Sequence, residues 1–150
     1  QLQVVHVASH AVEDAARPDL SSVVLSLVDE TGQSVDGHLR LHEIASLPLS
    51  GQAVVLSACR TLIGPDLRGE GLQGLARGFL QAGAAAVVAS LWDVDDRATM
   101  VLMRRFYEGL VTRRLAPDEA LAEAQRHMRQ QVRWRHPSDW AGFVVLGVTP

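Results

Sequence analysis

Residues 53–61 constrain the fold more than any other stretch of this sequence. An apolar run, Val54-Val55-Leu56, passes abruptly into small polar residues and the only cysteine of the chain, Cys59. A continuous apolar run of this length predicts a strand that is buried on both faces of a parallel sheet. In open α/β sheets, ligands and reacting groups gather beyond the carboxyl ends of the strands, which makes Cys59 a candidate nucleophile. The alternative is a buried, unreactive thiol, because most free cysteines pack as small hydrophobic residues.

Composition limits the class of protein. The chain has 150 residues, of which 47% are hydrophobic and 21% charged, and this predicts one globular domain over residues 1–150. A net charge of −3 gives no strong attraction to nucleic acid or to an anionic membrane. A single cysteine excludes an internal disulfide, and the sequence has no signal peptide and no long apolar span, so we expect a cytoplasmic protein. All 14 basic residues are arginine and asparagine is absent, which indicates the coding bias of a GC-rich, bacterial genome.

The order of the expected elements indicates the fold class. Apolar runs predict strands over residues 2–8, 23–28, 53–56, 84–91 and 140–148, with a loop over 12–21 and a turn over 29–32. Helical spacing predicts helices over 72–81, 96–113 and 117–133, and a short amphipathic segment over 39–44. In the helix over 96–113, Met100, Leu102, Met103, Phe106 and Leu110 are expected on the inner side. Alternating strands and helices predict an α/β fold with a mainly parallel sheet.

A cysteine nucleophile needs a base, because a thiol of ordinary pKa is only slightly ionised near neutral pH. His10 is the distinctive candidate among six histidines, because it follows the end of a predicted strand, as Cys59 does. If the two strands are parallel neighbours, both side chains lie at the same edge of the sheet. The separation of 49 residues is close to that between the histidine and cysteine of caspases, and Ala58-Cys59-Arg60 fits the core of the caspase cysteine motif.

The other histidines do not predict a metal site. His6 and His10 are four residues apart, but on a strand this spacing separates them by roughly 13 Å. His38 and His42 have the same spacing in a plausible helix without a third ligand, and His127 and His136 are expected to be solvated. The basic and aromatic residues 133–136 are expected to form a surface or packing feature rather than a nucleic-acid site.

A glycine-rich motif suggests a different function, the binding of a dinucleotide. Residues 69–74 spell G-x-G-x-x-G before a predicted helix, and Asp93 follows 19 residues after Gly74. A dinucleotide-binding loop needs these glycines directly after the strand, so that the helix N-terminus meets the pyrophosphate. Here about ten residues intervene, which favours a flexible loop beside Cys59 over a nucleotide site.

An acidic run follows the strand predicted over 84–91. Asp93, Asp95 and Asp96 either cap the next helix, with Asp95 or Asp96 near the N-cap, or line a pocket for a basic side chain. The pattern leaves both roles open.

With these residues in view, the chain resembles a CHAT domain, the caspase-like domain in the group of cysteine peptidases that includes caspases, separase and gingipains. The resemblance is carried, in family order along nearly the whole chain, by residues 6–10 (HVASH), 56–61 (LSACRT), 68–71 (RGEG), 78–84 (GFLQAGA), 90–96 (SLWDVDD), 106–107 (FY), 120–121 (AL), 136–137 (HP) and 140–143 (WAGF).

The resemblance implies a peptidase in which His10 and Cys59 form the catalytic dyad. It also implies an oxyanion hole made by the backbone N–H groups of Cys59 and of Ala11, where the family usually has glycine. Separase carries a similar W-D-V-x-D run, which implies that Asp96, or else Asp93, binds a basic substrate side chain. No cofactor is implied.

The resemblance also implies which segments accompany such a domain in the family. Caspase-like domains place two strands and their helices before the histidine strand, so the chain corresponds to the carboxyl-terminal part of such a domain. CHAT domains commonly follow helical repeats such as TPRs, which implies a regulatory helical-repeat region or partner.

We therefore predict a cysteine endopeptidase that cleaves a specific protein substrate. The alternative is a non-catalytic caspase-like interaction module. Ala11 favours this alternative, while the presence of both His10 and Cys59 opposes it. A nucleotide-binding α/β domain is the third hypothesis.

Overall fold

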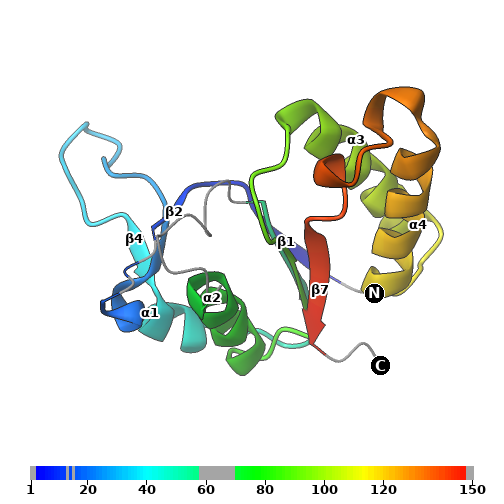
Figure 1. Cartoon of the computed structure of the whole chain (residues 1–150). Coiled ribbons are helices and arrows are strands. Elements are labelled where there is room, and N and C mark those ends of the chain that lie inside the picture. The colour runs from blue at the N-terminus through cyan, green and yellow to red at the C-terminus, as the bar shows by residue number, and fades with distance from the viewer. Residues whose placement is uncertain (1–2, 13, 15, 58–69, 148–150) are drawn as a thin grey trace.

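A four-stranded sheet lies at the centre of the computed structural model, which describes residues 3–12, 14, 16–57 and 70–147 (Figure 1). The strand order is β1 (Val4–Val7), β5 (Ala53–Leu56), β6 (Ala86–Ser90) and β7 (Phe143–Gly147). The first three strands are parallel, and β7 is antiparallel to β6. The predicted α/β fold with a mainly parallel sheet is confirmed.

Helices cover both faces of this sheet. Val54 and Leu56 of β5 pack in a cluster with α1 (Leu41–Ala45) and α2 (Glu70–Gln81). Val55 faces the opposite way, into a cluster with α3 (Asp96–Tyr107) and α4 (Pro117–Gln130). Every residue of β5 and β6 is buried, which is why both strands read as unbroken apolar runs in the sequence.

Local signals place the helix ends. The side chain of Asp95 accepts hydrogen bonds from the backbone N–H groups of Arg97 and Ala98, so Asp95 is the N-cap of α3. Pro117 starts α4, and Gly83 adopts φ +103° after α2. The helix predicted over 96–113 continues past α3 as a π-helical turn, η2 (Glu108–Thr112).

The expected inner side of α3 is confirmed for Leu102, Met103 and Phe106, and Leu110 of η2 is also buried. It is wrong for Met100, which is 65% exposed.

A second, smaller sheet lies outside the main one. It is antiparallel, in the order β2 (Ala11–Val12), β3 (Ser22–Val24) and β4 (His38–Arg40). A 3-10 turn, η1 (Pro18–Leu20), separates β2 from β3 within the predicted loop, and only part of the strand predicted over 23–28 forms. His38 lies in β4 and His42 in α1, so these two histidines do not share a helix.

Residues 25–37 leave the small sheet between β3 and β4 as a projecting two-limbed segment, here called the arm (Figure 1, light blue to cyan). Hydrogen bonds from Leu25 N–H to the Gly37 carbonyl (2.7 Å) and from Val35 N–H to the Leu27 carbonyl (3.0 Å) hold the limbs together. At the tip, Asp29 Oδ1 accepts from the N–H groups of Thr31 and Gln33, and Gly32 adopts φ +82°. The predicted turn over 29–32 therefore lies at the end of the arm.

Two short 3-10 turns connect α4 to β7, namely η3 (Val132–Trp134) and η4 (Pro137–Asp139). The Arg133 guanidinium lies 4.5 Å from the ring centroid of Trp134, so part of the basic and aromatic cluster packs on itself. No helix in the described part of the chain is long and apolar enough to cross a membrane.

Candidate active site

The carboxyl ends of β1, β5 and β6 meet at one edge of the main sheet. β1 and β5 pair in parallel from Val4↔Ala53 to Val7↔Leu56, a constant offset of 49 residues. The Ser57 N–H continues this ladder by donating to the Val7 carbonyl at 2.9 Å. His10 follows β1 by three residues, and Cys59 would be its counterpart after β5, at the same offset. Cys59 itself lies outside the described residues.

Backbone pairing with the small sheet holds the segment that carries His10. The His10 carbonyl accepts from the Val24 N–H at 2.8 Å, and the Ser9 hydroxyl donates to the Val24 carbonyl. The side chain of His10 is exposed. The structure thus presents an exposed imidazole at the carboxyl edge, on a backbone that is bonded to Val24 of β3.

The same pairing sets the direction of the Ala11 backbone. His10 bonds to Val24, so the neighbouring pair, Ala11↔Val23, is a non-hydrogen-bonded one. The N–H and C=O of Ala11 therefore point away from β3.

The acidic run lies at the same edge, after β6, and its three aspartates differ. Asp95 is the N-cap of α3, whereas Asp96 is the first residue of that helix and is exposed. Asp93 is also exposed and precedes the buried Val94, which anchors the run in the core. The N-cap expected at Asp95 or Asp96 is thus Asp95, and Asp96 is left for other contacts.

The indole of Trp92, next to this acidic run, is held by contacts with residues near the start of β7. Its indole Nε1 donates to the Ser138 carbonyl at 3.1 Å, although the side chain is 41% exposed. A Cβ added at Gly142 would lie 2.9–3.1 Å from the indole atoms, so a glycine is needed where the backbone meets the ring. The Ser90 hydroxyl also donates to the Trp92 carbonyl.

His6 has a partner that the sequence did not reveal. Its Nδ1 lies 2.8 Å from the Tyr107 hydroxyl, and the two rings stack with centroids 5.7 Å apart. Burial lowers the pKa of His6 and raises the pKa of Tyr107 to about 12. The phenol therefore keeps its proton and can donate to the neutral imidazole, on the α3 side of the sheet.

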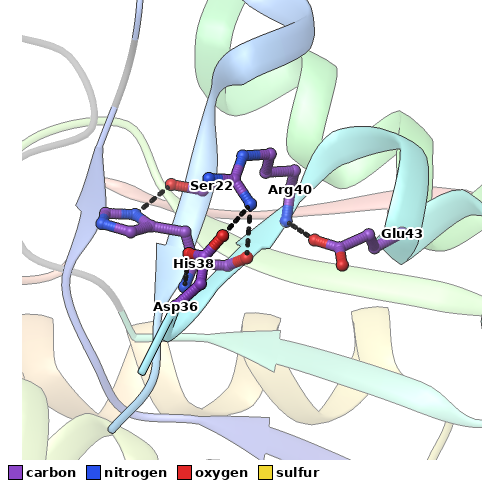
Figure 2. Close-up of polar contacts among 5 residues, drawn as sticks. All are labelled: Ser22, Asp36, His38, Arg40 and Glu43. Carbon is purple, nitrogen blue, oxygen red and sulfur yellow. Dashed lines mark hydrogen bonds and ion pairs between the residues drawn. The ribbon is translucent and has the colours of Figure 1, made fainter. Parts of the chain in front are cut away.

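A polar cluster on the outer edge of β4 was also missed (Figure 2). The His38 N–H donates to Asp36 Oδ1 (3.2 Å), and the Arg40 N–H donates to Glu43 Oε2 (2.8 Å). Arg40 Nη1 bonds to Asp36 Oδ2 (2.8 Å) and to the His38 carbonyl (3.5 Å). Side chains thus form hydrogen bonds with the backbone groups of β4 that point away from β3.

On the sheet face, the Ser22 hydroxyl and His38 Nδ1 lie 2.9 Å apart (Figure 2). Ser22 is 2% exposed, so this pair is a packing contact rather than an accessible nucleophile and base.

The remaining histidines have local roles. His127 Nδ1 lies 3.4 Å from Arg105 Nη2, and His136 Nδ1 accepts from the Ser138 N–H at the start of η4. The described residues contain no group of three or more histidine, cysteine, aspartate or glutamate side chains able to hold a metal ion. α2 begins at Glu70, fourteen residues after β5 ends at Leu56, which is unlike a dinucleotide-binding turn. Gly71 and Gly74 lie within α2, so the flexible loop expected from the glycine motif is wrong for residues 70–74, while Gly69 lies outside the described residues.

Comparisons with known proteins give relatives and a family for this chain. The chain is 35% identical over 105 residues to Tetratricopeptide repeat protein 28 of Mus musculus and 33% identical over 105 residues to the Homo sapiens protein of the same name. Each match covers 70% of this chain and 4% of the relative, so the chain spans a small part of the proteins that it matches. The family model described as the CHAT domain matches residues 1–148. With its α/β architecture and mainly parallel sheet, this chain belongs to the caspase-like CHAT domain family.

Proposed function

We propose that this CHAT domain is a cysteine endopeptidase in which Cys59 is the nucleophile and His10 the general base. The observation that carries the proposal is the register of β1 and β5, whose offset of 49 residues equals the separation of His10 and Cys59. Adjacent parallel strands with that register direct the residues that follow them to one edge of the sheet. The exposed His10 imidazole at this edge further supports the proposal.

The proposed reaction proceeds in two steps. His10 takes the proton of the Cys59 thiol, and the thiolate attacks the peptide carbonyl of the substrate. The tetrahedral intermediate expels the amine, which receives that proton from His10, and leaves an acyl-enzyme. Water then attacks the thioester, with His10 again taking a proton, and the carboxylic acid and the thiol are released.

The backbone N–H groups of Ala11 and Cys59 are proposed to bind the oxyanion. The strand pairing that turns the Ala11 N–H away from β3 supports this role. Oriented donors of this kind are worth about 3–4 kcal/mol of the barrier.

The proposed substrate carries arginine or lysine before the scissile bond. Asp96 is our first candidate for binding this side chain, and Asp93 the second. The use of Asp95 as the helix cap supports this choice, because the cap leaves Asp96 exposed at the same edge. The substrate itself is a protein, as expected of an endopeptidase.

Regulation by helical repeats is part of the proposal. The matched relatives are named for tetratricopeptide repeats, and this domain covers 4% of their length. We propose that a helical-repeat region or partner controls access to the edge that carries His10.

Covalent labelling tests the dyad. A peptidyl acyloxymethyl ketone with arginine at the reactive position should alkylate Cys59, as read by intact-mass and peptide mass spectrometry. Cys59→Ala should abolish labelling, and His10→Ala should slow it at least about 100-fold. His42→Ala, which removes an exposed histidine on α1, is the matched control and should label like the wild type.

The same assay distinguishes the alternative. A non-catalytic interaction module would be labelled at the rate of a free thiol, and that rate would not change in His10→Ala. That result would contradict the peptidase proposal.

A further inference from the structure

The arm carries exposed apolar and acidic side chains on a backbone whose two limbs are hydrogen-bonded to each other. Leu25, Leu27, Val28 and Val35 are 54%, 48%, 52% and 42% exposed. Residues 25–37 also hold Asp29, Glu30 and Asp36 but no arginine, lysine or histidine. Exposed apolar side chains gathered on one projecting segment are typical of an interaction surface.

A groove between α3 and α4 has complementary properties. Its volume is about 430 Å³, and it is lined by Met100, Val101, Arg104, Arg105, Glu108 and His127. Met100 is 65% exposed, so the groove presents an apolar side chain to solvent. Arg105 pairs with Glu108 at 2.5 Å, whereas Arg104 takes part in none of the ion pairs formed among the described residues. The charge of Arg104 contributes to the lowered pKa of Glu108, and its guanidinium can also donate hydrogen bonds to a carboxylate of another chain beside the apolar part of the groove.

Acidic residues predominate in the part of the chain that contains the arm, and arginines predominate in the part that forms α3 and α4. Residues 1–57 contain seven acidic residues and two arginines, whereas residues 97–133 contain eight arginines and four acidic residues. The arm projects from one end of the molecule, and α3 and α4 lie at the other end (Figure 1). An arm therefore cannot reach the groove of its own chain, but opposite charges favour its approach to the groove of another.

We propose that the arm of one copy docks into the α3–α4 groove of a second copy. Leu27 and Val28 cover Met100 and Val101, and Glu30 pairs with Arg104. A pair joined by one such contact retains a free groove on the copy that supplies the arm and a free arm on the copy that supplies the groove. Such a heterologous interface produces chains or rings, and the smallest ring is a pair of copies that exchange arms. The proposal is independent of the peptidase activity.

Sedimentation velocity and light scattering test the proposal on the 150-residue chain. The wild-type mass should rise above that of the monomer with concentration and fall in high salt, which screens the Glu30–Arg104 pair. An arm variant, Leu27→Ser/Glu30→Ser, and a groove variant, Met100→Ser/Arg104→Ser, should each weaken association at least about tenfold. Both pairs change exposed side chains, and thermal melts followed by circular dichroism should show that each variant folds.

Mixing the two variants gives the decisive result. The arm variant keeps an intact groove and the groove variant an intact arm, so together they should form a 1:1 complex that grows no further. In separate variants, Glu30→Arg and Arg104→Glu should each weaken association, and the two changes combined in a single chain should restore it. Arg77→Glu/Val132→Ser, which changes an exposed arginine of α2 and an 85% exposed valine, is the matched control and should associate like the wild type.

Three outcomes would overturn the proposal. One is a wild-type chain that stays monomeric at every concentration. A second is a groove variant that associates like the wild type while the arm variant does not, because this would mean that two arms pair with each other. A third is a mixture of the two variants that remains monomeric.

Discussion

The Nδ1 of His6 and the hydroxyl of Tyr107 lie 2.8 Å apart, and they join β1 to the end of α3. This contact links the strand that leads to His10 with the helical layer on one face of the sheet. Its neighbour along the chain, the π-helical turn η2, begins directly after Tyr107. Such turns occur frequently at functional sites.

The His6–Tyr107 contact predicts a pH-dependent stability. Burial lowers the pKa of His6 in the folded chain below its ordinary value of 6.5. As the pH falls, the unfolded chain therefore binds a proton at His6 at a higher pH than the folded chain does. This contribution to stability is present above pH 6.5 and is lost as the pH falls through the folded pKa. The melting temperature should therefore fall between about pH 7.5 and about pH 5.5, and less so in His6→Gln.

The glutamine in His6→Gln can still bond to Tyr107 but does not titrate, so it isolates the protonation of His6. His42→Gln, an exposed histidine on α1, is the matched control. Identical pH profiles for the wild type and His6→Gln would contradict the assignment.

Two neighbouring aspartates of the acidic run should affect different properties: Asp95 the stability of the fold, and Asp96 the substrate preference. Asp95→Ala removes both N-cap hydrogen bonds of α3 and should lower the free energy of unfolding by about 1 kcal/mol. Asp96→Ala breaks no cap and should change stability by less than about 0.5 kcal/mol. Urea titrations measure both values.

The proposed role of Asp96 is tested with the same two variants and peptide substrates. If Asp96 binds the basic side chain, Asp96→Ala should lower the preference for arginine over alanine before the scissile bond at least about tenfold in kcat/KM. Asp95→Ala should retain that preference in its folded fraction. An unchanged preference in Asp96→Ala would transfer the role to Asp93 or remove it from this run.

Two glycines with positive φ predict different costs of substitution. Gly32 at the arm tip has φ +82° and open space around it, so Gly32→Ala should cost about 1–2 kcal/mol from the backbone alone. Gly83 has φ +103°, and a Cβ there would lie 2.2 Å from the Leu49 carbonyl oxygen. Gly83→Ala should therefore cost clearly more, since α2 must shift relative to the loop before β5. Equal losses in denaturant titrations would contradict this close contact.

Local sequence patterns predict the central part of this fold. β5 and β6 are buried on both faces, so their apolar runs identify them, and α2, α3 and α4 show clear helical spacing. The alternation of strands and helices predicts that β1 and β5 are parallel, but their adjacency comes from the structure, because a strand predicted over 23–28 lies between them in the sequence. These are the features that place the segment carrying His10 at the carboxyl edge of the sheet.

The rest depends on long-range contacts or on very short elements. β2, β3 and β4 have only two or three residues each, too few to show a period. His6 and Tyr107 are separated by 101 positions, and no local pattern joins them. Met100 lies at the margin of the apolar stripe of α3, where helical spacing alone does not distinguish a buried position from an exposed one. Cys59, the other half of the predicted dyad, lies outside the described residues.

The cluster around Arg40 predicts how the small sheet avoids unwanted pairing. β4 is an edge strand, and an edge with free backbone groups can pair with another chain. Here the carboxylates of Asp36 and Glu43 accept hydrogen bonds from the outward N–H groups of His38 and Arg40. Arg40 Nη1 donates a hydrogen bond to the His38 carbonyl. The bond from Arg40 lowers the pKa of Asp36, so this carboxylate stays charged well into the acidic range.

Asp36→Ala/Glu43→Ala should therefore expose the edge of β4 and shorten the lag before thioflavin T-positive aggregation at neutral pH. Asp36→Asn/Glu43→Gln removes the same two charges but keeps an acceptor oxygen at each position. This control should aggregate later than the double alanine variant, because the backbone donors remain covered. If the two variants aggregate with the same lag, net charge rather than closure of the strand edge keeps the wild-type chain in solution. If neither differs from the wild type, the edge of β4 is protected by other parts of the molecule.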